Sequence, residues 1–145
     1  MNSAAISEVN GTGMHRWQAL LALVTGILII ASAFAHALAG WPRIYPALVA
    51  SSLPADLIGG LATGWYFGSV SMLAFGLITF LTGVSSLRSG TVSAIPLKLI
   101  SLTFAAFGIF AFISQGYAPH FLIFIIMGLL VGISSLRIPA KTLSA

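Results

Sequence analysis

Apolar residues fall into four long runs, separated by short polar or proline-rich segments. The runs cover residues 17–39, 61–87, 97–114 and 120–136. Each approaches or exceeds the roughly 20 residues that cross the hydrocarbon core of a bilayer. A segment in lipid must satisfy its backbone hydrogen bonds internally, so each run predicts a helix. The pattern therefore predicts an all-α integral membrane four-helix bundle, with one transmembrane domain over residues 1–145.

The first run permits a second interpretation. Arg16, the apolar stretch 19–30 and the small residues of 31–39 also resemble a cleavable signal peptide. A retained span explains the run better, because it pairs with a later run as a hairpin. We therefore expect residues 17–39 to stay in the protein as its first span.

The longest connection, residues 40–60, contains three prolines, which break regular structure. We expect an outer loop there, in which residues 44–53 can form a short helix along the membrane surface. Pro54 and Asp56 suit the first turn of the next helix, because proline needs no donor there and a carboxylate favours the positive end of the helix dipole.

Composition supports a membrane location. The chain is 59% hydrophobic and 6% charged, with a mean hydropathy of +1.09, whereas soluble domains carry about 25% charged residues. The net charge of +4 does not indicate nucleic-acid binding, because the few basic residues are scattered beside apolar runs.

The basic residues also predict an orientation. Five of them flank the predicted cytoplasmic ends of the spans, and Arg43 alone lies in the outer loop; the five are Arg16, Arg88, Lys98, Arg137 and Lys141. Because cytoplasmic flanks are enriched in Lys and Arg, we expect a multi-pass protein of the cell membrane with both termini cytoplasmic.

The second and fourth runs end in similar segments. Residues 83–88 read Gly-Val-Ser-Ser-Leu-Arg and residues 132–137 read Gly-Ile-Ser-Ser-Leu-Arg, with five of six positions identical. Two helices that merely end alike would also give this similarity. We favour an internal repeat of two tandem transmembrane hairpins, which run in parallel rather than as an inverted repeat.

Glycines at helical spacing predict close helix packing. Gly60, Gly64 and Gly68 are four residues apart, and we expect Gly76 on the same side. Gly128 and Gly132 form a second Gly-x-x-x-Gly pair. In lipid, such glycines let helix backbones approach closely. The neighbouring helix can belong to the same chain, to a second copy or to a larger membrane complex.

Catalytic chemistry finds little support. The central parts of the spans hold no Asp, Glu, Lys or Arg, which argues against proton relays and ion paths. The chain has no cysteine, and its two acids, Glu8 and Asp56, cannot form a carboxylate pair. We therefore predict no catalytic residues, no metal site and no nucleic-acid partner. The membrane hydroxyls, Ser69 and Ser101 among them, are expected to bond their own helix carbonyls.

Polar and aromatic residues gather at the predicted outer face. The candidates are His36, Arg43, Asp56, Trp65, Tyr66 and Gln115. Neutral imidazole can ligate metal or haem, so His36 and His120 are weak candidates for cofactor binding. The more ordinary interpretation is that His36 bonds Asp56 or a loop carbonyl, and we expect no cofactor.

Three functions stay open on this basis. The leading one is a non-catalytic accessory or lipid-contacting component that acts through close helix packing. The second is a small binding or transport protein for an apolar or neutral solute, entered from the outer face. The third is a membrane oxidoreductase subunit that binds haem or quinone near His36 and His120.

Overall fold

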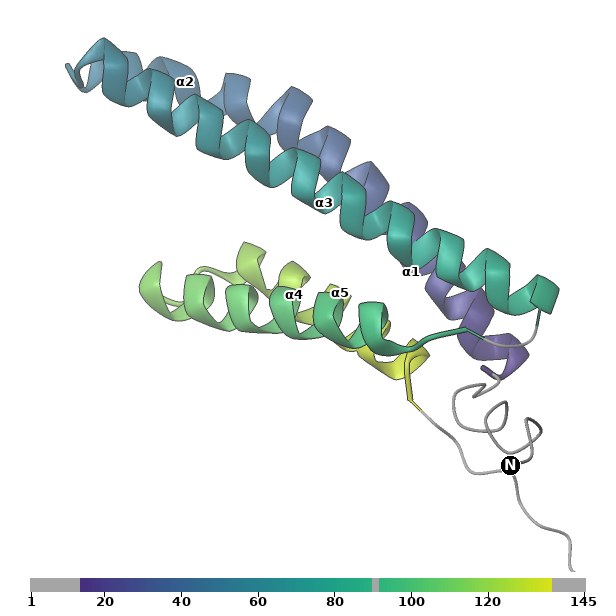
Figure 1. The fold of residues 1–145 in the computed structure, drawn as a ribbon. Helices are drawn as coiled ribbons and strands as arrows, with labels where there is room; N and C mark the ends of the chain where they lie inside the picture. The colour runs from purple at the N-terminus through teal and green to yellow at the C-terminus, as the bar shows by residue number, and fades with distance from the viewer. Residues whose placement is uncertain (1–13, 90–91, 137–145) are drawn as a thin grey trace, which may run out of the picture. The chain divides into compact units, whose positions relative to one another are not determined.

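The chain is mostly helical in the part described by the computed structural model, residues 14–89 and 92–136, and that part contains no strand. Its elements follow one another as a chain of helices (Figure 1). In order they are α1 (Arg16–Ala35), the π-helix η2 (His36–Gly40), α2 (Trp41–Ala50), α3 (Ala55–Ser89), α4 (Ile95–Ser114), the 3₁₀ helix η3 (Pro119–Phe121) and α5 (Leu122–Ser134).

Three helical stretches are long and apolar enough to cross a membrane. They are Arg16–Ala50, which joins α1, η2 and α2, then Ala55–Ser89 and Ile95–Ser114. The fourth apolar stretch, Pro119–Ser134, is shorter. The all-α prediction is therefore confirmed for the described residues, and the three long helices are compatible with a small membrane protein.

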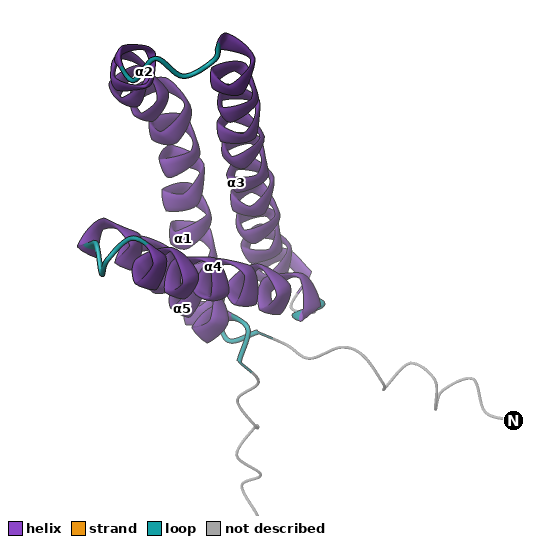
Figure 2. Cartoon of the chain, turned by 90° about the vertical axis from the view of Figure 1, so that its left-hand side faces the viewer, coloured by secondary structure: helices purple, strands orange, loops and turns teal. Residues whose placement is uncertain are grey.

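The connection predicted over residues 40–60 is mostly helical, and the short helix expected within it at residues 44–53 begins earlier and ends earlier than predicted. Residues 41–50 form α2, which continues directly from η2, and the connection to α3 is confined to residues 51–54 (Figure 2). Pro46 lies inside α2 and removes one helical N–H donor. The helix tolerates this loss because Pro42, whose carbonyl would have received that bond, is exposed.

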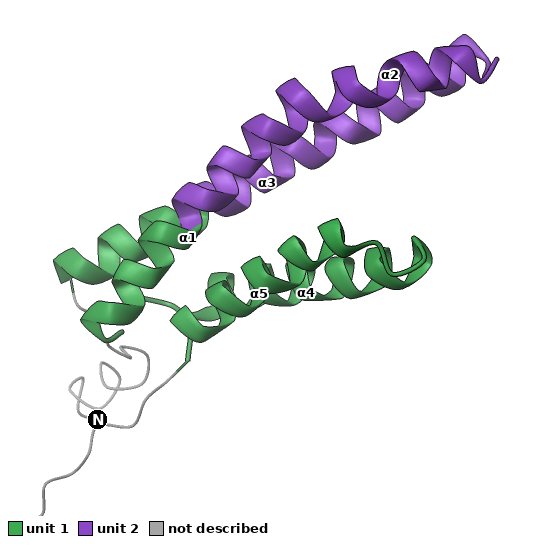
Figure 3. Ribbon diagram, turned by 180° about the vertical axis from the view of Figure 1, so that it is seen from behind, with its two compact units in different colours: residues 1–25, 78–145 green, residues 26–77 purple. Residues whose placement is uncertain are grey.

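The chain forms two compact units (Figure 3). Unit 1 comprises residues 1–25 and 78–145, and unit 2 comprises residues 26–77. The single transmembrane domain expected from the sequence stays a prediction. Each unit is described by itself below.

In unit 1, α4 and α5 pack with their backbones in close approach at glycines. A Cβ atom built on Gly128 would lie 2.8 Å from the Ala105 nitrogen and 2.9 Å from the Ser101 oxygen. One on Gly108 would lie 2.8 Å from the Ile125 nitrogen. Ser101 Oγ donates across the hairpin to the Gly128 carbonyl at 2.8 Å, rather than to its own helix. These glycines leave no room for a side chain.

Unit 1 also contains a buried amide that joins the start of α1 to the end of α5. Gln18 is fully buried, and its Oε1 accepts the His15 backbone N–H at 3.0 Å. This is half of a capping box, in which the third helical residue bonds back to the N-cap residue. Gln18 Nε2 donates to the Leu136 carbonyl at 2.7 Å and to the Ile133 carbonyl at 3.4 Å.

In unit 2, residues 26–50 run antiparallel to residues 55–77. A Cβ atom built on Gly76 would lie 2.9 Å from the Ile30 nitrogen and 3.1 Å from the Gly26 oxygen. Toward the α2 end of the unit, Gly40 lies against Trp65. The two helical segments of unit 2 therefore meet through their backbones near Gly76 and through the Trp65 side chain near Gly40.

Gly60 and Gly64 do not pack against another helix of unit 2, although their spacing predicted that they would. A Cβ atom on either would meet nothing within 4 Å, and one on Gly68 would meet only the His36 ring, at 3.9 Å. At about 100° per residue, Gly64 lies about 120° and Gly60 about 160° around the helix from Gly76. Four-residue spacing placed neighbours together, but it did not place all four glycines on the buried face.

Candidate functional site

His36 lies at the centre of the polar contacts of unit 2. It is the first residue of η2 and is half-buried. Its Nδ1 atom lies 2.8 Å from Ser69 Oγ, and Ser69 Oγ in turn donates to the Trp65 carbonyl at 3.1 Å. Ser69 itself is buried. The imidazole is therefore fixed by a hydroxyl that is already committed to its own helix.

The protons of this chain of hydrogen bonds indicate which His36 nitrogen is free. A serine hydroxyl has one proton to donate, and Ser69 gives it to the Trp65 carbonyl. In that arrangement the hydroxyl accepts from His36, and we expect the imidazole proton on Nδ1, since the roles of this pair follow the tautomer of the ring. In a neutral imidazole with that tautomer the other nitrogen is an acceptor. His36 Nε2 has no hydrogen-bond partner among residues 14–89 and 92–136.

Trp65 holds His36 in a second way. The two rings are stacked, with centroids 4.0 Å apart and planes inclined by 6°. The indole Nε1–H also donates to the His36 backbone carbonyl at 2.8 Å. One side chain thus covers a face of the imidazole and binds the peptide group that carries it.

Gly40 makes room for this arrangement. A Cβ atom built at Gly40 would lie 2.6 Å from Trp65 Cζ2, closer than real side chains come. Gly40 ends the π-helix that begins at His36, and π-helical turns occur frequently at functional sites. The indole therefore lies directly on the wider turn whose first carbonyl it binds.

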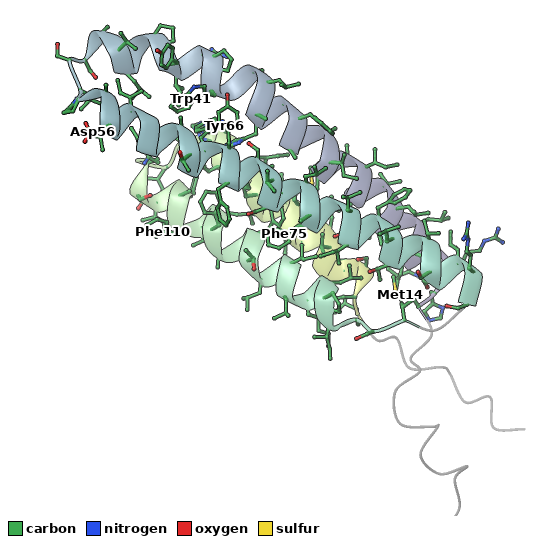
Figure 4. The ribbon with its side chains drawn as sticks, turned by 45° about the horizontal axis from the view of Figure 1, so that its top comes forward. Met14, Trp41, Asp56, Tyr66, Phe75 and Phe110 are labelled. Atoms are coloured by element: carbon green, nitrogen blue, oxygen red, sulfur yellow. The ribbon has the colours of Figure 1, made fainter. Side chains whose placement is uncertain are left out.

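Further aromatic rings continue from Trp65. Trp41 is 9% exposed, and its ring centroid lies 6.0–6.3 Å from those of Tyr45, Trp65 and Tyr66. These separations fall in the range of favourable aromatic pairs. Figure 4 shows Trp41 and Tyr66 directed toward one another from α2 and α3. The four rings form an aromatic cluster beside His36, and both tyrosines are about half exposed.

The other polar residues predicted for the outer face divide between the two units. Arg43 and Asp56 are exposed, and neither side chain forms an ion pair or hydrogen bond within the described part of the chain. The expected bond of the His36 ring to Asp56 or a loop carbonyl is therefore wrong, because Ser69 takes that place. Gln115 and His120 are exposed residues of unit 1. His120 contacts the Phe121 ring, with centroids 4.1 Å apart.

The sequence predicted that Ser69 would bond only its own helix, and this accounts for one of its two hydrogen bonds. Ser69 bonds its own helix, as do Ser71, Thr82 and Thr103. Its second bond, to His36, could have been suspected from register. Trp65, Ser69 and Gly76 are separated by four and seven residues, a spacing that puts them on one face.

No three His, Cys, Asp or Glu residues come together as a metal site in the residues described. Comparison of the chain with family models, curated proteins and solved structures finds no match. The arrangement itself is an imidazole held by Ser69 and Trp65, with Nε2 unpaired in the described residues, and flanked by aromatic rings.

Proposed function

We propose that this chain is a small multi-pass protein of the cell membrane, built from two tandem transmembrane hairpins with both termini cytoplasmic. Three helices of sufficient length and apolarity support the membrane location. The excess of basic residues on one side supports the orientation. The stretch 119–134 covers about 24 Å as a helix, and modest bilayer thinning accommodates so short a span.

Within this topology, His36 lies near the outer boundary of the membrane. It follows Arg16 by 20 residues, and this length of helix covers about 30 Å, the thickness of the hydrocarbon core. Trp41, Tyr45 and Tyr66 continue from it toward the outside, as expected of an interfacial aromatic belt. The site is therefore reached both from lipid and from the outer surface.

Of the functions that the sequence left open, the geometry favours the binding of a neutral solute at the outer face. The observation that carries this conclusion is His36 Nε2, which has no hydrogen-bond partner in the described residues and belongs to a ring held in place by Ser69 and Trp65. A solute that hydrogen-bonds to Nε2 would use the ring nitrogen that the described residues leave unpaired. The role we propose is one of binding, because within residues 14–89 and 92–136 no acid or base is hydrogen-bonded to the imidazole.

The accessory role stays as the second candidate. Gly60 and Gly64 are exposed and have open space above their backbones. A helix of a second copy, or of a larger membrane complex, could approach closely there. The haem or quinone subunit gains no support as a two-histidine site, because His36 and His120 belong to different units.

The experiment is to analyse what the full-length protein retains when purified in mild detergent. Wild-type protein, His36→Ala and the control His120→Ala are extracted with organic solvent, and neutral lipids are quantified by mass spectrometry. We expect one species near equimolar amount in wild type and in the control, and several-fold less in His36→Ala at an unchanged elution volume. Equal lipid content in all three would refute the binding role, and an equimolar protein partner would establish the accessory role.

A further inference from the structure

We propose that Arg16 and Arg88 together bind the phosphate of one anionic phospholipid at the cytoplasmic end of unit 1. This inference rests on the proposed membrane location, and it does not depend on solute binding at His36. It follows from three features of unit 1: the level of the two arginines on their helices, the side on which they lie and the lack of an acid to neutralise them.

The two arginines lie at the same level of neighbouring helices. α1 and α3 meet at Gly83, where an added Cβ atom would lie 2.8 Å from the Ala19 oxygen and 3.0 Å from the Leu23 nitrogen. In unit 1 these two segments run antiparallel (Figure 3). Arg88 follows Gly83 by five residues, and Arg16 precedes the midpoint of the two contacted residues by five. Each arginine therefore lies about 7.5 Å beyond the contact.

Helix geometry also puts the two arginines on the same side of the α1–α3 pair. Seen from the cytoplasmic end, α1 runs away from the viewer, and Arg16 lies about 40° clockwise from the contact at about 100° per residue. α3 runs toward the viewer, and Arg88 lies about 140° anticlockwise from the contact. On two facing helices, these rotations direct both side chains the same way. Axes of packed helices are about 8–10 Å apart, so one phosphate can lie between the two guanidinium groups.

This side of the pair is the open one. Gln18 and Ser86 lie two residues from Arg16 and Arg88 respectively, and so about 200° around the same helices. Gln18 is 0% and Ser86 is 5% exposed, and Gln18 donates to the Leu136 carbonyl after the end of α5. Both arginines are exposed. A lipid headgroup that binds them therefore does not compete with α5.

Neither guanidinium group is neutralised within the described ranges. The side chains of Arg16 and Arg88 form no ion pair or hydrogen bond there. The chain has two acidic residues, of which Asp56 lies in the first turn of α3, at its other end, and Glu8 lies outside the described residues. Arg16 also begins α1, whose first turn contains no acid and whose N-terminus is the positive end of the helix dipole. An anion at this end offsets the repulsion.

The position of the pair selects a lipid phosphate. Trp17, next to Arg16, is 48% exposed, and tryptophan is enriched at the boundary between membrane and water. In the proposed topology, both arginines lie at the inner boundary of the hydrocarbon core, beside the headgroups of the cytoplasmic leaflet. Arginine binds phosphate through two parallel N–H groups, and two cations favour a headgroup with a net negative charge.

The experiment counts the lipids that full-length protein retains. Wild type and variants are released from nanodiscs that contain dioleoylphosphatidylglycerol and dioleoylphosphatidylcholine in equal amounts, and native mass spectrometry measures the lipids bound. The variants are Arg16→Gln and Arg88→Gln. The controls are Arg43→Gln, which removes the same charge from unit 2, and Lys98→Gln, which removes a charge from α4.

We expect wild type to retain one tightly bound phosphatidylglycerol. Either variant should bind it about tenfold more weakly, as the loss of one charge-assisted hydrogen bond predicts, and both controls should retain it. Because a ligand stabilises the state that binds it, phosphatidylglycerol should raise the unfolding midpoint of wild type and not of the two variants. A lower midpoint of the variants in phosphatidylcholine alone would show a structural role and overturn the inference.

Two tightly bound lipids in wild type, with one lost in each variant, would show separate sites and overturn the shared one. Equal retention of the two lipids, or equal loss in a control, would also overturn it. The same stabilisation by inorganic phosphate in nanodiscs of phosphatidylcholine alone would exclude a lipid as the specific ligand. Failure of wild type to enter nanodiscs would refute the proposed membrane location itself.

Discussion

The α4–α5 hairpin and the α2 end of unit 2 bring their helices together by opposite means. In the hairpin, glycine backbones contact the facing helix directly, as at Gly128. In unit 2, the space around His36 is filled by a stacked imidazole and indole, while Gly60 and Gly64 are bare. The comparison teaches that a glycine spacing identifies a smooth face of a helix, and the neighbouring residues decide whether another helix lies on it.

The two regions are also expected to contribute differently, the hairpin to the stability of the fold and the surroundings of His36 to ligand binding. In the hairpin, Ser101 bonds the facing carbonyl of Gly128 where the backbones meet. Around His36, the ring nitrogen Nε2 has no hydrogen-bond partner in the described residues. We therefore expect substitutions in the hairpin to act on the free energy of unfolding, and substitutions around His36 to act chiefly on ligand binding.

The largest effect is expected for Gly128→Ala. Its new methyl group would stand 2.8 Å from the Ala105 nitrogen, and a backbone cannot give way without separating α4 from α5. Overpacking of this kind costs about 1–3 kcal/mol, and we expect the upper end. Equilibrium unfolding in mixed detergent measures the loss. An unchanged midpoint would show that the hairpin does not depend on this contact.

Gln18→Ala should be the next most damaging. The substitution leaves the His15 N–H and the Leu136 carbonyl without their partner, at a cost of about 1–2 kcal/mol. The exposed amide of Gln115 provides the control, and Gln115→Ala should leave the unfolding midpoint within error. Similar midpoints for the two variants would contradict the bridging role of Gln18.

Gly40→Ala tests the side-chain contacts around His36 in unit 2. Its methyl group would stand 2.6 Å from Trp65 Cζ2, so the indole must leave the imidazole. The indole N–H bond to the His36 carbonyl would then be lost, at about 1 kcal/mol. Trp65 emission should shift in wavelength in a Trp17→Phe, Trp41→Phe background. An unaltered spectrum would mean that Trp65 does not lie against Gly40.

Gly64→Ala should have the smallest effect and the opposite sign. The position is exposed with nothing within 4 Å, and alanine favours a helix over glycine by up to about 1 kcal/mol. We expect a gain of about 0.5 kcal/mol in the same unfolding assay. Destabilisation of monomeric protein would place a helix of this chain against Gly64, whereas loss of a dimer at unchanged midpoint would place a second copy there.

Hydrophobic runs predicted the helical class, because each run needed internal backbone hydrogen bonds. The boundaries were less predictable. Pro42 and Pro46 indicated a loop, yet exposed positions after a π-helix tolerate them, and α2 continues to Ala50. Spacing in steps of four grouped Gly60 with Gly64, but an α-helix drifts by about 40° over four residues. That drift separates them from Gly76.

The candidate site was predictable in its residues and not in its bonds. His36 and Trp65 stood out as a histidine and an aromatic near a span end, and they are in contact. Asp56 or a loop carbonyl was the expected partner of His36, whereas the buried hydroxyl of Ser69 holds that position. Spacing within α3 puts Ser69 on the same face as Trp65, but the register between the two helices decides which residue of that face meets His36.

The most direct test of the account is the protonation of the His36 ring nitrogens. Nitrogen-15 NMR of full-length protein labelled at histidine and held in nanodiscs distinguishes a nitrogen that carries a proton from one that does not, with His36 assigned through His15→Gln, His120→Gln protein. The account predicts a neutral ring with the proton on Nδ1 and a bare Nε2, and loss of that preference in Ser69→Ala. A proton on Nε2 with a bare Nδ1 in the wild type would contradict it.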